Sequence, residues 1–172
     1  ELLWLERQEG YARVFLQSYP LQKRDAMLVF SHGGLNAAPI DMALEASARG
    51  LKVITVSSHQ NAKIGRRSNS SGKVLSEVAD VAIDNHVPPE DALVDVGRLE
   101  RVAAGSTVAA VAIAMALVAE TAAVLAKTGH VPPTFVSPNV KGVSPGHMAG
   151  VYQAFTEFYY ARPFKAGKRA KG

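Results

Sequence analysis

The chain has 172 residues, 48% of them hydrophobic and 20% charged, which is typical of one soluble globular domain with a core of ordinary size. It contains no cysteine, so disulfides and thiolate metal sites are excluded. Five of its 19 basic residues lie in 162–172, which holds no acid, so the net charge of +4 conceals a body with 14 basic and 15 acidic residues.

The first half of the chain alternates between helix and strand patterns. Pro39 suits the first turn of a helix, and Gly50 stands where a C-terminal cap is expected. In chain order the patterns predict a helix over 2–18, strand 27–31, helix 39–49, strand 52–57, a polar loop 59–71, helix 73–78 and strand 79–84. Strands that alternate with helices in this way favour an α/β fold with a parallel sheet.

The second half is predicted to be mainly helical. A long connection over 85–105 precedes an Ala-rich helix 106–127, a short strand 134–137 and an aromatic helix 151–161. Residues 102–119 carry no charge, but eight of these eighteen residues are Ala, which favours a core or subunit-interface helix over a membrane span. We expect 162–172 to be a flexible basic tail and not a nucleic acid-binding segment.

Several polar stretches are expected at the carboxyl edge of the sheet, where open α/β folds bind ligands. The Gly-Gly loop after strand 27–31 can turn backbone N–H groups toward an anion. Ser and Thr at helix starts add hydroxyls, although helix capping alone also explains them. The candidate phosphate-binding residues are Ser31, His32, Gly33, Gly34, Asn36, Ser70, Ser71, Ser106 and Thr107.

Other classes of site are not supported by the motifs. The sequence has no P-loop, no Gly-x-Gly-x-x-Gly fingerprint and no Gly-x-Ser-x-Gly elbow. The five His residues stand singly, without metal-ligand spacing, so we expect neither a metal nor a cofactor. The absence of cysteine, and the charged residues Glu1, Glu6, Arg7 and Glu9 where a signal peptide would be apolar, lead us to expect a cytoplasmic protein.

The order of these motifs resembles the SIS (sugar isomerase) domain, in an uncharacterised phosphosugar isomerase-like subfamily. The resemblance covers about residues 5–140. It departs from the family pattern at Gly33, where a serine is usual, and at His32, where Asn is frequent. Its residues are Ser31-His32-Gly33-Gly34-Leu35-Asn36, 39–46, 50–54, Ser70-Ser71-Gly72-Lys73, 78–80, 83–85, 87–88, 91–94, Ser106-Thr107-Val108, 117–120 and 133–137.

The resemblance implies a flavodoxin-like three-layer α/β/α sandwich. Three parallel strands are few for this class, so we expect 1–161 to be an N-terminally incomplete SIS domain whose first strands are absent from this chain. The resemblance also implies a homo-oligomer, a dimer or larger, that binds a phosphorylated sugar or amino sugar.

The resemblance further implies an aldose–ketose isomerase that transfers a proton through an enediol. His86 and Glu90 are the catalytic candidates, with His32 and Asp91 at the same edge of the sheet. A non-catalytic phosphosugar sensor is the alternative, since binding needs only hydroxyls and amides. Lyase or etherase chemistry on an amino-sugar phosphate is a third possibility.

Overall fold

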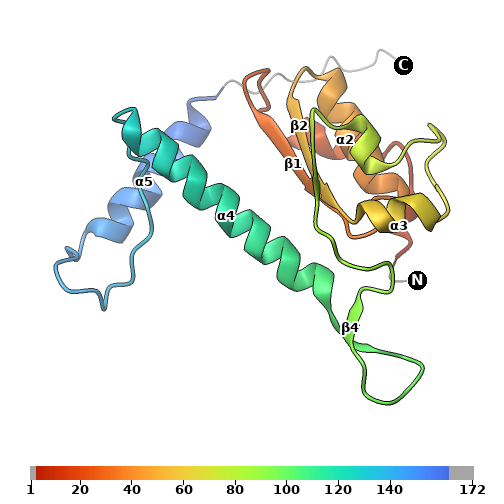
Figure 1. Cartoon of the computed structure of the whole chain (residues 1–172). Helices are drawn as coiled ribbons and strands as arrows, with labels where there is room; N and C mark the ends of the chain where they lie inside the picture. Colours follow the sequence, from red (N-terminus) through yellow and green to blue (C-terminus); the bar gives the residue numbers. More distant parts are fainter. Residues whose placement is uncertain (1–2, 163–172) are drawn as a thin grey trace, which may run out of the picture. The chain divides into compact units, whose positions relative to one another are not determined.

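The computed structural model describes residues 3–162 and has the predicted α/β fold (Figure 1). In chain order its elements are the 3₁₀ helix η1 (Leu5–Arg7), α1 (Tyr11–Phe15), η2 (Leu16–Ser18), β1 (Ala26–Phe30), α2 (Ala37–Ala48), β2 (Lys52–Ser57), α3 (His59–Ile64), η3 (Leu75–Val78), β3 (Val81–Asp84), β4 (Ala92–Val94), β5 (Val102–Ala104), α4 (Gly105–Lys127) and α5 (His147–Tyr160).

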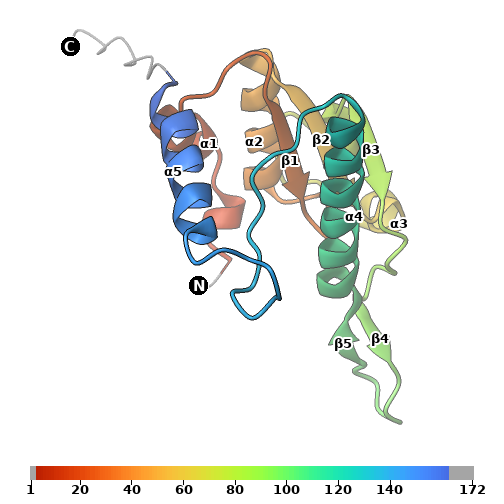
Figure 2. The same cartoon turned by 90° about the vertical axis from the view of Figure 1, so that its left-hand side faces the viewer.

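Strands β1, β2 and β3 form a parallel sheet in that order (Figures 1 and 2). In the register, Phe30 of β1 lies opposite Val56, and Ser57 of β2 lies opposite Asp84. The predicted boundaries of β2 are confirmed residue for residue, and those of β1 and β3 are within two residues. Because the strands run the same way, their carboxyl ends lie at one edge of the sheet.

Helix α2 packs on one face of this sheet and forms the core with it. It presents a buried residue at every third position, Ala37, Ile40, Ala43 and Ala46, which places them on one side of the helix. The small side chains permit close approach to the strands, where Val29 and Val53 are buried, and Leu51 and Leu75 complete the cluster. Each fully buried Val, Leu or Ile side chain contributes about 1.5–3 kcal/mol to folding.

Three expectations for the N-terminal unit are wrong in detail. The helix expected over 2–18 is broken, because Gly10 has a φ of 81° and leaves only the five-residue helix α1 with 3₁₀ segments. The loop expected over 59–71 contains α3, whose N-terminus is capped by the Ser58 hydroxyl accepting from Asn61 N at 3.2 Å. The helix expected over 73–78 is the shorter 3₁₀ helix η3.

Two expectations for the following segments are also wrong. The connection 85–105 contains the antiparallel hairpin β4–β5, which projects from the start of α4 (Figures 1 and 2). Residues 134–137 form no strand, because two prolines precede them and no described segment pairs with them. Helix α4 is confirmed to within one residue, and α5 begins four residues before the predicted start.

The chain divides within α4 into two units, 1–114 and 115–172, which are considered separately. In the second unit, Phe135 packs against Tyr152 of α5 with ring centroids 5.2 Å apart. Among residues 3–162, α4 is the one helix long and apolar enough to span a membrane, by length and composition alone. None of its apolar window is buried among the described residues, so the expected role as a core helix is not met within this chain. The alternative role as a subunit-interface helix and the absence of membrane contact stay predictions. Except for Arg162, the expected tail lies outside the described residues.

Candidate functional site

The loops at the carboxyl edge of the sheet are joined by backbone hydrogen bonds. Ser31 N donates to the Val56 carbonyl at 3.0 Å, and Ser58 N donates to the His32 carbonyl at 2.8 Å. These bonds continue the β1–β2 pairing beyond the strands. They therefore hold the start of loop 31–36 in a fixed position beside the end of β2.

Gly34 is required by the local geometry of that loop. Its φ is +60°, and a Cβ there would lie 3.2 Å from both the Leu75 Cβ and the Ser57 Cβ. A side chain would thus meet backbone strain and a tight contact together. Gly33 has the milder restriction that a Cβ would lie 3.2 Å from Asn61 Nδ2, the end of a flexible side chain.

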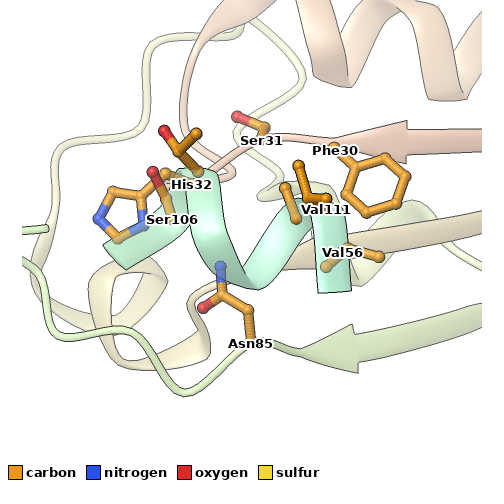
Figure 3. Close-up of a pocket in the computed structure, with 9 residues that line it drawn as sticks. Phe30, Ser31, His32, Val56, Asn85, Ser106 and Val111 are labelled. Atoms are coloured by element: carbon orange, nitrogen blue, oxygen red, sulfur yellow. The ribbon is translucent and has the colours of Figure 1, made fainter. Parts of the chain in front are cut away.

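A cavity of about 350 Å³ lies where this loop meets the first turns of α4 (Figure 3). The polar residues gather toward one end and the apolar residues toward the other. His32 is the one titratable side chain among the lining residues, and none of them is Lys or Arg. The lining consists of Phe30, Ser31, His32, Val56, Asn85, Ser106, Thr107, Ala110 and Val111.

The first turn of α4 already holds an anionic side chain, that of Asp91. Ser106 N and Ser106 Oγ donate to its two carboxylate oxygens at 2.7 and 2.8 Å, and Gly105 N donates to its carbonyl at 2.8 Å. Partial burial raises the pKa of Asp91, but the Ser106 hydrogen bonds and the His32 charge outweigh it and lower the pKa overall. Asp91 is therefore ionised at neutral pH.

Ser70 and Ser71 lie away from this cavity. Ser70 N and Oγ both donate to the carboxylate of Glu9, at 2.6 and 2.5 Å. The Ser70 hydroxyl, followed by its backbone N–H, lowers the pKa of Glu9. Ser71 N donates to Asn69 Oδ1 at 2.9 Å, which closes a turn. Both serines thus have partners within the chain, and neither lines the 350 Å³ cavity.

Asn36 lines a second hollow, of about 710 Å³. Its Nδ2 donates to Glu6 at 2.6 Å, so this candidate also binds a carboxylate. Phe30, Ser31 and His32 line both hollows. The other lining residues of the second hollow are Leu3, Glu6, Gly33, Leu35, Asn36, Pro39, Asn61 and Asp91.

The two catalytic candidates lie outside both hollows. The His86 side chain is 85% exposed, and its Nδ1 lies 3.3 Å from Asp84 Oδ2. Partial burial raises the pKa of Asp84, but backbone N–H groups of His86 and His59 lower it on balance. Glu90 is exposed. Within residues 3–162, no three His, Cys, Asp or Glu side chains gather as a metal-binding group.

The structure thus brings together part of the predicted set, namely Ser31, His32, Ser106 and Thr107. Sequence reasoning missed Asn85, although its place directly after β3 was a usable signal. It named Asp91 at this edge of the sheet but missed its contact with Ser106. That contact spans fifteen residues across an unpredicted hairpin, so no local pattern could indicate it.

Residues 1–58 match the family model of the SIS domain. This region includes β1, α2, β2 and the glycine loop, so the family recognised from the motifs is confirmed. The α/β fold with its parallel sheet is also the fold of that domain. Residues 1–58 are therefore similar to part of a SIS domain, a class associated with phosphosugar binding.

Curated relatives extend the similarity over most of the chain. A UPF0309 protein of Shouchella clausii is 37% identical over 139 residues, which is 80% of this chain and 56% of the relative. A UPF0309 protein of Halalkalibacterium halodurans is 35% identical over 81% of this chain and 58% of the relative. A UPF0309 protein of Streptomyces coelicolor is 37% identical over 80% of this chain and 55% of the relative. The chain thus spans little more than half the length of these relatives, whose names state no activity.

Proposed function

We propose that this chain binds a phosphorylated sugar and that the protein is a sugar-phosphate isomerase. The observation that carries the proposal is the 350 Å³ cavity, where the loop after β1 meets the N-terminal turn of α4. The cavity lies at the carboxyl edge of a parallel sheet, the usual ligand position in open α/β folds. Its volume is at the lower end of the range for small-molecule sites.

The chemistry of the lining suits a phosphate ester. Ser31 and Thr107 offer hydroxyl donors. The N-terminus of the 23-residue helix α4, where Gly105 N and Ser106 N donate to Asp91, adds partial positive charge. Asn85 offers an amide for a sugar hydroxyl, and Phe30 and Val56 offer an apolar wall. The SIS-domain match of residues 1–58 supports the same ligand class.

We assign the proton transfer to His32. Aldose–ketose isomerisation needs a group that removes a proton from one carbon and returns it to the next. The His32 Nε2 atom lies 3.4 Å from the Pro89 carbonyl, and Nδ1 is buried without a partner among the described residues. An unsatisfied buried nitrogen is costly, and a ligand hydroxyl in the cavity would remove that cost. His86 and Glu90 have less support, because neither lines the cavity.

A phosphosugar sensor without catalysis is the second candidate. It is favoured by the position of His86 and Glu90 outside both hollows, which leaves His32 as the one titratable side chain lining the smaller hollow. Binding would still use the hydroxyls and the α4 N-terminus. The two candidates therefore differ in whether a bound sugar exchanges its proton.

The test combines binding with hydrogen exchange. Glucose 6-phosphate and fructose 6-phosphate are titrated while the melting temperature is recorded, and NMR in deuterated water then follows exchange at the carbon next to the carbonyl. We expect binding by the wild type and a loss of exchange in His32→Gln with binding kept. Binding without exchange in the wild type would favour the sensor. If no member of a wider set of phosphosugars shifts the melting temperature, the proposal is wrong.

Thr107→Val tests the phosphate position. The substitution keeps the side-chain shape and removes the hydroxyl, so we expect a roughly tenfold loss of phosphosugar affinity. The matched control is Thr121→Val on the same helix, because its hydroxyl donates to the Leu117 carbonyl and Thr121 does not line the cavity. Equal affinities in Thr107→Val and wild type would place the phosphate elsewhere.

We also propose a homo-oligomer in the cytoplasm. On the first turns of α4, Val108 and Val111 are 71% and 60% exposed, which is unfavourable for apolar residues unless another surface covers them. A single monomeric species in sedimentation velocity would contradict the oligomer.

A further inference from the structure

Asp91 occupies the position that a ligand's phosphate would take at the start of α4. Its two carboxylate oxygens accept from Ser106 N at 2.7 Å and from Ser106 Oγ at 2.8 Å. Ser106 is one of the residues that the sequence pattern assigns to phosphate. We propose that Asp91 is an internal anion that competes with the ligand phosphate and so sets the affinity of the site. The proposal rests on the proposed function.

The charges around the cavity make this competition effective. No Lys or Arg lines it, so no permanent positive side chain is available to neutralise both a carboxylate and a phosphate. The partial charge of the α4 N-terminus, about half an elementary charge, is shared between them. Two anions within a few ångströms repel strongly at a partly buried site. Asp91 does not line the 350 Å³ cavity itself, but its carboxylate is bonded to Ser106, the residue next to Thr107. A phosphate bound beside Thr107 therefore either meets the Asp91 carboxylate or displaces it from Ser106.

The backbone around Asp91 connects this competition to the hairpin β4–β5. Gly105 N donates to the Asp91 carbonyl at 2.8 Å, so the residues that flank the hairpin are joined at the start of α4. Asp91 itself has a φ of +61°, a conformation that Asp, Asn and Gly adopt more readily than other residues. Removing the charge with Asn therefore preserves both the backbone conformation and a capping side chain.

The experiment compares Asp91→Asn with the wild type in the full chain. Calorimetric titrations with inorganic phosphate and with glucose 6-phosphate give the dissociation constants at low salt. We expect Asp91→Asn to bind both ligands about tenfold more tightly, since the repulsion is gone. The gain should shrink as salt screens the charges. Binding of neutral glucose should be unchanged by the substitution.

Asp80→Asn is the matched control. Asp80 also accepts from a backbone N–H, that of Val53 at 2.8 Å, but at the amino end of the sheet. The Asp80→Asn substitution should leave the affinity for phosphate unchanged. If Asp91→Asn fails to fold by circular dichroism, Asp91→Ser supplies a second neutral capping residue for the same titrations.

The outcomes separate this inference from the proposed function. If the wild type binds phosphate and Asp91→Asn binds it equally or more weakly, the competition is overturned and Asp91 is only a helix cap. Tighter inorganic phosphate binding with no phosphosugar binding by either protein supports the competition and overturns the proposed function. No binding of any anion by either protein overturns both.

Discussion

Two serines in this chain hold a carboxylate in the same way, and only one of them lines a cavity. Ser106 binds Asp91 through its N–H and hydroxyl at 2.7 and 2.8 Å, and Ser70 binds Glu9 through the same two groups at 2.6 and 2.5 Å. The Ser106 site lies beside the 350 Å³ cavity, whereas Ser70 is exposed on a loop.

The difference lies in what surrounds each serine. Ser106 is the second residue of a 23-residue helix that starts at the carboxyl edge of the sheet, so it lies at the positive end of a long helix dipole. Ser70 precedes only the four-residue 3₁₀ helix η3, which supplies far less aligned backbone. A serine that can donate both its N–H and its hydroxyl therefore indicates a position for an anion. Whether that anion can be a ligand depends on the helix and the sheet edge next to the serine.

The largest expected effect comes from two glycines, Gly34 in the loop that lines the cavity and Gly72 in the loop that carries Ser70. Gly34 and Gly72 both have positive φ, at +60° and +68°, but only Gly34 has close neighbours. We expect Gly34→Ala to destabilise the fold by about 2–3 kcal/mol, from strain plus the tight contacts with Leu75 and Ser57. Gly72→Ala should cost about 1 kcal/mol, from strain alone. Urea unfolding monitored by circular dichroism gives both values.

The two glycine substitutions should also differ in their effect on ligand affinity, with Gly34→Ala again having the larger effect. Gly34→Ala displaces the loop that lines the cavity, so phosphosugar affinity should fall, while Gly72→Ala should leave it unchanged. Equal destabilisation by both substitutions would show that the packing around Gly34 relaxes freely. That result would contradict a loop held in place by its neighbours.

The next effect concerns the serine hydroxyls themselves. If the Ser106 site receives the ligand, Ser106→Ala should weaken phosphosugar binding about fivefold, by loss of a hydrogen bond to a charged group. Ser70→Ala should leave affinity within error, because its partner Glu9 lies outside both hollows. Isothermal titration of both variants checks this contrast. A loss of affinity in Ser70→Ala would mean that the ligand reaches across the N-terminal segment.

The fold could be predicted from the sequence largely because its signals are local. The β-branched run 52–57 and the helix that follows Asn36 are set by residues within a few positions, and their boundaries were found to within two residues. Two of the failures arose where a single residue overrode a pattern. Gly10 interrupts an apolar periodicity, and Ser58 caps a helix within a polar segment.

The candidate site could be predicted only as a set of chemical groups. Ser31, Ser106 and Thr107 were identified because each follows a strand or begins a helix. Which of these groups face a cavity depends on contacts between distant segments, such as Asp91 with Ser106 and Glu9 with Ser70. Such contacts leave no spacing pattern in a single sequence.

The smallest expected effect is in the pH dependence of stability. The pKa values of Asp91 and Glu9 are both lowered in the folded state, Asp91 by hydrogen bonds and a charge that outweigh its partial burial, and Glu9 by the hydroxyl and N–H of Ser70. A carboxyl with a lowered folded pKa adds stability that is fully present above its unfolded pKa, about 4, and is lost as pH falls through the folded value. Both contributions should therefore be complete at pH 7.

Urea midpoints of Asp91→Asn and Glu9→Gln measure these contributions. Each variant should be less stable than the wild type at pH 7, and the difference should shrink below pH 4, where the native carboxyls become neutral like the introduced amides. Asp91→Asn should show the larger change, since Asp91 is partly buried and Glu9 is exposed to screening by solvent. A difference that grows on acidification would mean that the two carboxylates are held against their electrostatic preference, and that Ser106 and Ser70 do not bind anions favourably.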